Sequence, residues 1–259
     1  MGVVGTGNSA RALACYLASR GHEVHLLVRH IDRFPWLTER MTLTATGKVE
    51  GTFALGGVTD RADRFAAAVG TVFVATVATA YRDVAARLAP HLDDDHRVVL
   101  FSSKLCGSVE VEHALREHGV RGVPVLETDA LFACRIQDDH SVWVRGFKGW
   151  TLFSAPRHAM TRAWAPLMHR YFPGLEAARN VIQRGLTDFG ALAHPTTMVA
   201  NMNRVDRKEP FLFYHEGFTE KTVAVLEEVE KEFRAVAHAY EAPLIAMKDL
   251  LDRYYAGDA

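Results

Sequence analysis

The first residues of the chain carry a pattern that can hold a dinucleotide. The stretch Gly5-Thr6-Gly7-Asn8-Ser9-Ala10 lies between an apolar strand and a helical run that stops at Gly21. Gly5 permits a tight strand-to-helix reversal, Gly7 leaves room for a pyrophosphate, and the small Ala10 lets helix and strand pack closely. The helix N-terminus offers free N–H groups to phosphate oxygens. We therefore predict a cofactor-binding turn made of Gly5, Gly7, Asn8, Ser9 and Ala10.

A second strand, expected over residues 23–28, ends in a residue that bears on cofactor type. Sites for NAD usually place an acidic side chain there to bind the ribose 2′-hydroxyl. This chain has Arg29 instead, followed by His30 and Arg33. A guanidinium can grip a 2′-phosphate with two hydrogen bonds. We expect NADP, with NADPH preferred and NAD as the alternative cofactor; the competing interpretation is that Arg29 only solvates a loop.

The segment from Gly190 to Asn201 holds the strongest candidate for acid–base chemistry. Pro195 suits the first turn of a helix, where its missing N–H costs nothing, so His194 is expected at or just before the helix N-terminus. There the helix dipole would lower the pKa of the imidazole, as acid–base work near neutral pH requires. Asn201 lies about two turns further on and is expected on the same face. The alternative is a capping histidine with an interior asparagine.

Strands and helices alternate through the first part of the chain and would position these residues. Strands are expected at 70–77, 97–101 and 123–126, and helices at 81–92 and 109–117. Two β-like runs, 41–46 and 49–55, predict a small hairpin or edge extension, and 141–145 and 150–153 are expected to be closing strands.

Pro156 is expected to mark the boundary, because the apolar spacing after it is helical almost throughout. We predict an α/β Rossmann domain with a mainly parallel, doubly wound sheet over residues 1–156. A smaller all-α domain, which binds substrate and dimerises, is expected over residues 157–259. Ligands bind beyond the carboxyl ends of such strands, so the loops to inspect are 76–78, 102–107 and 127–135. The first of these, Thr76, Val77 and Ala78, is expected to contact the cofactor.

Composition excludes several classes of function. The formal charge of −1 argues against binding to nucleic acid or a membrane surface, and no apolar run is long enough to span a bilayer. The cysteines are odd in number and lie far apart, at Cys15, Cys106 and Cys134. A disulfide framework is therefore not expected, and we expect a cytoplasmic location. No HExxH or Cys/His spacing predicts a metal site. The first strand is short, which suggests a native start a few residues upstream.

The chain resembles the octopine/nopaline dehydrogenase family, the opine dehydrogenases, over nearly its whole length. The more specific likeness is in His194-Pro195 with Asn201 and in Phe211-Leu-Phe-Tyr214-His-Glu216-Gly217. It also includes the glycine turn, the strand 72–76, Glu127-Thr128, Ala133-Cys134-Arg135 and Lys148. The resemblance implies reductive coupling of an amino acid's amine to a 2-oxo acid, with His194 as the catalytic imidazole and the helical domain binding substrate.

Further substrate contacts are expected around these loops. The resemblance places Thr128 near the 2-oxo acid, where it would hydrogen-bond the carboxylate, and Asn201 is expected to bind substrate as well. Arg135 is predicted to pair with a carboxylate; the alternative for an arginine after a strand is a solvated edge position.

The chain also departs from the family pattern. The family's glycine-rich loop is here Ser102-Ser103-Lys104-Leu105-Cys106-Gly107, and members usually continue well past Ala259. The helical domain is therefore expected to be shortened and to lack the acidic residue that orients the catalytic histidine in the family. Asp188, Glu216, Glu230 or a second subunit are the substitutes left open, and a solvated helical charge is the alternative for each.

Together these features predict a small-molecule enzyme of biosynthesis, expected as a homodimer. The first hypothesis is an NADPH-dependent reductase of a C=N bond, acting on an imine formed from amine and carbonyl, including an internal cyclic imine of a specialised metabolite. The second is reduction of a ketone or 2-oxo acid, as in ketopantoate reductase or 3-hydroxyacid dehydrogenases, where Lys104 would polarise the ketone. The third is an NADP-binding sensor without catalytic activity.

Overall fold

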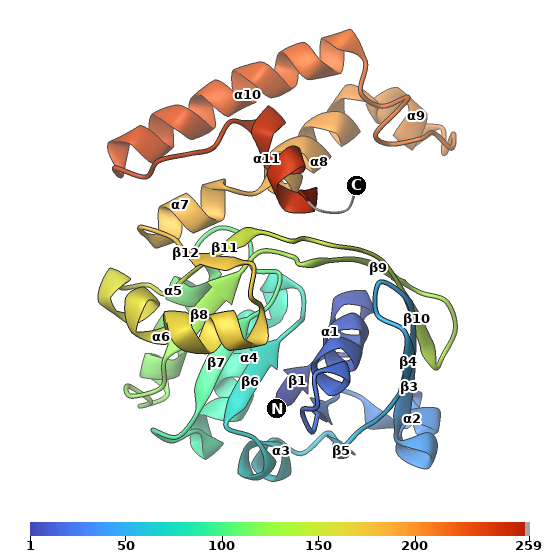
Figure 1. Cartoon of the computed structure of the whole chain (residues 1–259), viewed down its shortest axis with the longest axis vertical. Coiled ribbons are helices and arrows are strands. Elements are labelled where there is room, and N and C mark those ends of the chain that lie inside the picture. Colours follow the sequence, from blue (N-terminus) through green and yellow to red (C-terminus); the bar gives the residue numbers. More distant parts are fainter. Residues whose placement is uncertain (257–259) are drawn as a thin grey trace.

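The computed structural model describes residues 1–256 and is built around one large twisted sheet (Figure 1). Its eight strands run in the order β12-β11-β8-β7-β6-β1-β2-β5. Their bounds are β1 (Gly2–Val4), β2 (His25–Leu27), β5 (Gly57–Thr59), β6 (Thr71–Val74), β7 (Arg97–Leu100), β8 (Val125–Thr128), β11 (Thr151–Ser154) and β12 (Leu175–Ala177). Strand β11 pairs antiparallel with β8 and parallel with β12, whereas the other neighbours are all parallel. The predicted mainly parallel, doubly wound sheet is confirmed.

Helices cover both faces of this sheet. The core on one face contains side chains of α1 (Asn8–Ser19) and α6 (His158–Tyr171). The core on the other face contains side chains of α3 (Ala62–Ala68), α4 (Tyr81–Leu88) and α5 (Gly107–Glu117). The remaining short helices of this part are α2 (Pro35–Arg40), η1 (Ile31–Arg33), η2 (Ala78–Ala80) and η3 (Ala89–His91).

A second sheet covers the outer side of α1. Its four strands run in the order β4-β3-β10-β9, with bounds β3 (Thr42–Gly47), β4 (Gly51–Ala54), β9 (Phe132–Ile136) and β10 (Ser141–Phe147). Leu43, Ala45, Val142 and Val144 join the core that contains α1. Helix α1 therefore lies between two sheets, which explains why seven of its twelve residues are buried.

The second sheet changes one expectation. The hairpin predicted for residues 41–55 is confirmed as β3–β4. The strand at 141–145 was expected to close the large sheet, and this is wrong, because β10 pairs with β3 and β9 instead. Burial alternates along β10, as it does in a strand with only one face covered. By contrast, β11 is buried at all four residues and joins the large sheet as predicted.

The large sheet continues past Pro156. Helix α6 packs on it, and β12 adds an edge strand next to β11, so the expected helical run after Pro156 is interrupted. The all-helical segment begins at α7 (Val181–Leu186). It continues through α8 (Phe189–Ala200), α9 (Met202–Asp206), α10 (Glu220–Ala239) and α11 (Met247–Tyr255). The predicted second domain ran to residue 259, of which 257–259 lie outside the described residues.

The helical segment lies across one end of the sheet (Figure 1). Its own apolar core, which includes Phe189, Leu192, Leu226 and Tyr254, also takes in Trp150 and Leu152 from around β11. Thr219, a residue type that helix N-caps favour, caps α10, since its side-chain oxygen accepts from the Thr222 N–H at 3.2 Å. The helical segment therefore closes over the carboxyl ends of the parallel strands, where the sequence predicts ligand binding.

Candidate active site

The glycine turn between β1 and α1 has the geometry that a dinucleotide needs. Gly5 has a φ of +121°, and a Cβ there would lie 2.8 Å from the Ala75 carbonyl oxygen. A Cβ on Gly7 would meet nothing within 4 Å, so this side of the turn is open. No side chain caps the start of α1 at Gly7. The first-turn N–H groups are thus free of a side-chain acceptor and fit a pyrophosphate.

A cavity of about 210 Å³ adjoins this turn. It is lined by Val4, Gly5, Leu27, Arg29, Thr76, Val77, Ala80, Asp83, Val84 and Arg87. The predicted cofactor residues Gly5, Arg29, Thr76 and Val77 therefore come together, while Ala78 starts η2 and does not line the cavity. Arg29 Nη2 lies 2.9 Å from Asp83 Oδ2, and both side chains are exposed. The residues present fit the ribose end of a nicotinamide dinucleotide, and a 2′-phosphate there would compete with Asp83 for the Arg29 guanidinium.

The remaining residues of the turn are held by the second sheet and by their own helix. Asn8 Oδ1 accepts from the Ile136 N–H at 2.8 Å. Ser9 lies on the first turn of α1, and its side chain hydrogen-bonds Cys134. The small Ala10 is buried, and its Cβ would be 3.5 Å from a Cβ on Gly5, as the close packing of strand and helix requires.

The expected position of His194 at a helix N-terminus is wrong. Helix α8 begins at Phe189, and Asp188 is its N-cap, accepting from the Ala191 N–H at 3.0 Å. His194 and Pro195 therefore lie inside the helix, past the first turn. The prediction gave Pro195 the position that proline prefers, whereas Asp188 is the residue that satisfies the free N–H groups. Because His194 does not lie at the helix N-terminus, the helix dipole does not account for a lowered pKa of its imidazole.

His194 lies instead on the wall of a larger cavity, of about 490 Å³, between the helical segment and the strand ends. The apolar part of the lining consists mainly of Phe132, Phe189, Phe218, Leu251 and Tyr254, with Tyr214 and Tyr255. Burial, and then the positive charge of Lys104, lower the pKa of His194. The predicted direction of the shift is confirmed, but its cause is desolvation and a neighbouring ammonium group.

Tyr214 is the hydrogen-bond partner of this imidazole. Its Oη lies 2.7 Å from His194 Nε2. Burial raises the pKa of Tyr214, so the phenol keeps its proton, and the tautomer of the ring sets whether the phenol or the Nε2–H group is the donor. Tyr214 thus occupies the orienting position that was expected to hold a carboxylate.

The three carboxylates proposed for that position have other partners in the described part of the chain. Asp188 caps α8 and pairs with Lys104. Glu216 accepts from the Leu212 N–H at 3.3 Å and lies 3.5 Å from Arg204. Glu230 pairs with Arg234 and accepts from the Met247 N–H.

The floor of the cavity alternates positive and negative side chains. Lys104 Nζ lies 2.8 Å from Asp188 Oδ2 and 3.6 Å from Asp129 Oδ1, and both carboxylates are almost fully buried. Lys148 pairs with the other oxygen of Asp129 and lies 3.8 Å from the centroid of the Tyr254 ring. Burial alone would raise the pKa of Asp129, but Lys148 and Lys104 together lower it. The two ammonium groups and the two carboxylates therefore balance in charge.

Below this floor, a fully buried ion pair joins the helical segment to the sheet. Arg184 Nε, on α7, lies 3.1 Å from Glu127 Oε1, on β8, and neither side chain is exposed. Glu127 Oε2 also accepts from the Ser108 N–H at 2.6 Å. Arg184 Nη2 donates to the carbonyl oxygens of Ser103 and Lys104. The loop after β7 is thus fixed by both partners.

Three predicted substrate contacts are placed away from the cavity lining. Thr128 is fully buried at the end of β8, and its hydroxyl donates to the Asp129 carbonyl at 3.0 Å. Arg135 is exposed on β9, where it pairs in register with Trp143. Asn201 ends α8, and its amide donates to the Thr197 and Gly217 carbonyls. Their roles in substrate binding stay predictions.

The site residues that sequence reasoning missed are Asp129 and Arg184, while Tyr214 and Lys148 were named only as part of a likeness and Asp188 only as a possible partner of His194. The Phe-x-Tyr-x-Glu-Gly stretch was a usable signal for Tyr214. Asp129 and Arg184 carried no signal, because a charged residue is most often a solvated one.

Comparison with known proteins agrees with this two-part arrangement. Residues 1–157 match the family described as ketopantoate reductase PanE/ApbA. Residues 177–259 match the family described as NAD/NADP octopine/nopaline dehydrogenase, alpha-helical domain. The chain belongs to the opine dehydrogenase family. Its nucleotide-binding part is of the ketopantoate reductase type.

Individual members of the family and their solved structures extend the match to most of the chain. An opine dehydrogenase of Arthrobacter sp. (strain 1C) is 28% identical over 242 residues, which make up 92% of this chain and 67% of that protein. The NADP⁺-bound yersinopine dehydrogenase is 17% identical, with a TM-score of 0.77, over 98% of this chain and 67% of its own. Octopine dehydrogenase with NADH and pyruvate is 20% identical, with a TM-score of 0.73, over 96% of this chain and 68% of its own.

These two structural likenesses show a shared fold, and the chain spans about two thirds of the length of these family members. In residues 1–256, no helix is long and apolar enough to cross a membrane.

Proposed function

We propose that this opine dehydrogenase-like oxidoreductase is an NADPH-dependent reductase of a C=N bond, which forms from an amine and a carbonyl compound in the cavity beside His194. The observation that carries the proposal is an imidazole with a lowered pKa on the wall of a 490 Å³ cavity at the carboxyl edge of a dinucleotide-binding sheet. Such edges are where α/β enzymes bind their ligands.

The chemistry suits a neutral imidazole. An amine must lose protons before it replaces a carbonyl oxygen, and that oxygen must gain protons to leave as water. A histidine that is neutral at pH 7 can accept a proton from the amine and return it to the oxygen. A bound nicotinamide supplies the hydride that reduces the resulting C=N bond. Aromatic rings make up much of the cavity wall and reduce the access of water, which hydrolyses a C=N bond.

The substrate pair is inferred from chemistry and from the relatives. The names of the solved relatives include complexes with pyruvate and with agmatine. We propose a 2-oxo acid or related carbonyl compound together with a primary amine. Reduction of an internal cyclic imine is the intramolecular version of the same proposal. Turnover of amine and 2-oxo acid pairs to a secondary amine of the expected mass by the purified protein would contradict this intramolecular version.

NADPH is the proposed cofactor because Arg29, and no acidic residue, follows β2 and lines the small cavity. Asp83 competes for this guanidinium in the ion pair at 2.9 Å. Arg29→Ala should weaken NADPH binding about tenfold and leave NADH binding nearly unchanged, since one bidentate phosphate contact is lost. Asp83→Asn should strengthen NADPH binding. Fluorescence titration with both cofactors measures this, and an unchanged preference in Arg29→Ala would contradict the 2′-phosphate contact.

The central experiment is His194→Ala, with cofactor affinity and turnover measured on the same preparation. We expect NADPH affinity to be kept and turnover of amine and carbonyl pairs to fall about 10²- to 10⁴-fold, the usual contribution of a general acid–base. His215→Ala is a matched control, because His215 is exposed and next to Tyr214. Equal loss of affinity and turnover in His194→Ala would indicate a structural histidine.

A second candidate is direct reduction of a ketone to an alcohol. Lys104 favours it, because an ammonium group beside His194 can polarise a carbonyl. Mass analysis separates the two, since a secondary amine contains both substrates and a hydroxy acid only one. A protein that binds NADPH and oxidises it with neither substrate class would instead be a sensor.

A further inference from the structure

The loop after β7 carries Lys104 at the cavity wall, and its backbone is unusual at two residues that flank this lysine. Ser102 and Cys106, on either side of Lys104, have φ values of +69° and +58°, although neither is glycine. Residues with side chains adopt this left-handed region rarely, and where they do the surrounding structure must hold them. A loop held this way between two strained residues presents its side chain in one direction.

The restraint comes from Arg184 and its helix. Arg184 Nη2 lies 2.5 Å from the Ser103 carbonyl oxygen and 2.6 Å from that of Lys104. Gly185, the next residue, approaches the loop so closely that a Cβ there would clash with Leu105 Cδ1. The buried carboxylate of Glu127 keeps the guanidinium in place. The loop is therefore clamped by α7 from one side, and its lysine projects from the other.

The protein occupies only some of the N–H donors of the Lys104 ammonium group. Its nitrogen contacts Asp188 at 2.8 Å and Asp129 at 3.6 Å, and an ammonium group has three N–H donors. The side chain is 50% exposed and lines the same cavity as His194. Burial works against its charge, but Asp188 and Asp129 raise the pKa of Lys104, so it stays protonated at neutral pH. At least one N–H is left for a molecule in the cavity.

The local charge balance indicates which ligand atom that donor suits. Lys104 and Lys148 are matched by Asp129 and Asp188, so the floor offers no excess positive charge to a full anion. An oxygen that is neutral when it binds and gains negative charge as the reaction proceeds is a better fit, because a fixed donor then helps most in the transition state.

We propose that Lys104 is a second catalytic residue, which donates a hydrogen bond to the oxygen on the reacting carbonyl carbon of the substrate. The inference rests on the proposed function and gives His194 and Lys104 different roles. His194 transfers protons, and Lys104 donates a hydrogen bond to the oxygen. The amine nitrogen attacks the carbon, the C–N bond forms, and the carbonyl π pair moves onto the oxygen held by Lys104. The substrate's ammonium group gives up one proton before the attack and a second proton after it, and His194 carries each in turn to that oxygen. The oxygen leaves as water, the nitrogen keeps one proton in the C=N bond, and Lys104 keeps all of its protons.

These separate roles predict that the loss of Lys104 slows the reaction of a carbonyl substrate but not the reduction of a preformed imine. Lys104 acts only while an oxygen is bonded to the reacting carbon. A preformed cyclic imine has no such oxygen, so its reduction does not need this donor. A residue that merely held the fold would affect both substrates alike.

The test compares Lys104→Met with the unmodified protein, using NADPH with either pyruvate plus a panel of primary amines or 2-methyl-1-pyrroline as a preformed imine. We expect kcat for coupling to fall about 100-fold or more, as when one oxyanion donor is removed, and imine reduction to stay within about threefold. Lys104→Arg, which keeps a donor and the charge, should retain more coupling than Lys104→Met. An equal fall with both substrates would overturn the proposal and leave Lys104 a structural residue.

The outcomes also separate this inference from the proposed function. If the unmodified protein reduces only ketones, to alcohols, the C=N function fails, and a Lys104-dependent rate still supports the donor. If it reduces only the cyclic imine, the C=N function stands and the Lys104 proposal is overturned. If it turns over neither, calorimetric binding of pyruvate to the NADPH complex decides: affinity about tenfold weaker in Lys104→Met supports the donor. Equal or undetectable binding overturns it.

Discussion

At the residue scale, the imidazole of His194 owes its properties to its neighbours. It lies inside a helix, yet its pKa is lowered by burial and by the charge of Lys104, and Tyr214 Oη lies 2.7 Å from Nε2. Burial and a nearby positive charge both disfavour protonation of the ring. Desolvation and the ammonium group thus keep the imidazole neutral, while a phenol, and not a carboxylate, is its hydrogen-bond partner.

This gives a prediction about pH. Since its pKa is lowered from 6.5, His194 should be neutral at pH 7 and become protonated only as the pH falls below 6.5. The rate of amine and carbonyl coupling should therefore decline on the acid side, with an apparent pKa below 6.5. An NMR titration of the imidazole, assigned by comparison with His194→Ala, measures the same group without turnover.

Lys104→Met provides the control for this titration. Removing the ammonium group removes a cause of the lowering, so the midpoint of the His194 titration should move to higher pH. An unchanged midpoint in Lys104→Met would show that Lys104 does not act on the imidazole. A His194 midpoint above pH 6.5 in the unmodified protein would contradict the prediction of a lowered pKa.

At the element scale, the turn between β1 and α1 separates two requirements that glycine meets. Gly5 is needed for the backbone, because its φ is +121° and a Cβ would contact the Ala75 carbonyl. Gly7 has φ −75°, which any residue adopts, and lies next to open space. The first glycine therefore serves the fold and the second serves the ligand.

Alanine substitutions should show this difference. Gly5→Ala is expected to lower the free energy of unfolding by about 1–3 kcal/mol through backbone strain. Gly7→Ala should change it by less than about 0.5 kcal/mol, yet weaken NADPH binding, because the added methyl group occupies the space for the pyrophosphate. Urea unfolding and cofactor titration measure the two effects. Equal behaviour of the two variants in both assays would contradict the assignment.

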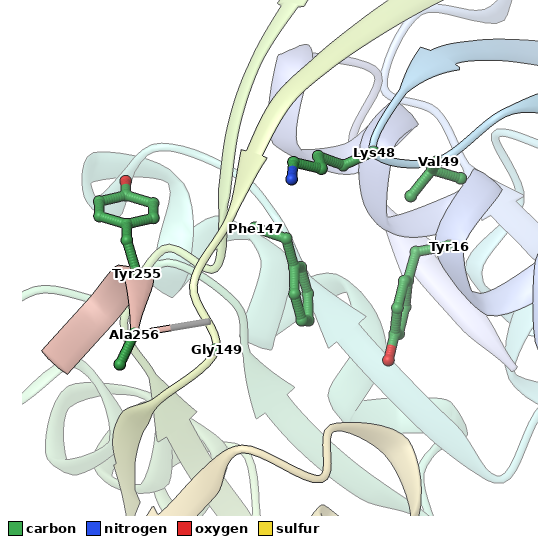
Figure 2. A pocket seen from close by; sticks show the side chains of 7 residues that line it. All are labelled: Tyr16, Lys48, Val49, Phe147, Gly149, Tyr255 and Ala256. Carbon is green, nitrogen blue, oxygen red and sulfur yellow. The ribbon is translucent and has the colours of Figure 1, made fainter. Parts of the chain in front are cut away.

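A third cavity shows how elements far apart in the sequence meet. Figure 2 shows Tyr16 of α1 and Phe147 of β10 beside the β3–β4 turn, with Tyr255 and Ala256 on the opposite side. The space has a volume of about 280 Å³. Tyr16 stacks on Phe147 and Phe172, and its hydroxyl donates to the Tyr171 carbonyl. Helix α1, the second sheet and the end of α6 are thus joined by one aromatic cluster, which steadies the cofactor helix.

At the scale of the whole molecule, the buried pair of Arg184 and Glu127 joins the helical segment to the sheet. Both side chains are fully buried, and the guanidinium also holds the loop that carries Lys104. An ion pair in such a place adds little stability over an apolar replacement, but leaving one partner alone is costly. Its clearer effect is to fix the register between the two parts of the active site.

Removing one partner tests this view. Arg184→Leu should lower the free energy of unfolding by about 3–5 kcal/mol, because Glu127 is left as an uncompensated buried charge. The double variant Arg184→Leu/Glu127→Leu should recover part of that loss. Urea unfolding measures both, and a loss of less than about 1 kcal/mol in the single variant would argue against the pair as the link. Arg179→Leu serves as the control, since its pair with Glu241 is exposed and should contribute about 0–1 kcal/mol.

The sequence by itself determined the features that depend on near neighbours in the chain. The Gly5–Ala10 turn, the buried strands and the mainly parallel sheet follow from local backbone needs and apolar patterns, and Thr219 follows from the chemistry of helix caps. The position of His194 was misjudged even so, because two residues, Asp188 and Pro195, competed for the same helix start.

Only the tertiary structure decided what surrounds that histidine. Tyr214 reaches the ring from the loop between α9 and α10, and Lys104, in the loop after β7, meets Asp188 only when the helical segment closes over the sheet. The same holds for β10 and β12, whose partners are far away in the sequence. Burial and charge pairing depend on three-dimensional distance, and a one-dimensional pattern records neither the contact nor the loss of water that gives it strength.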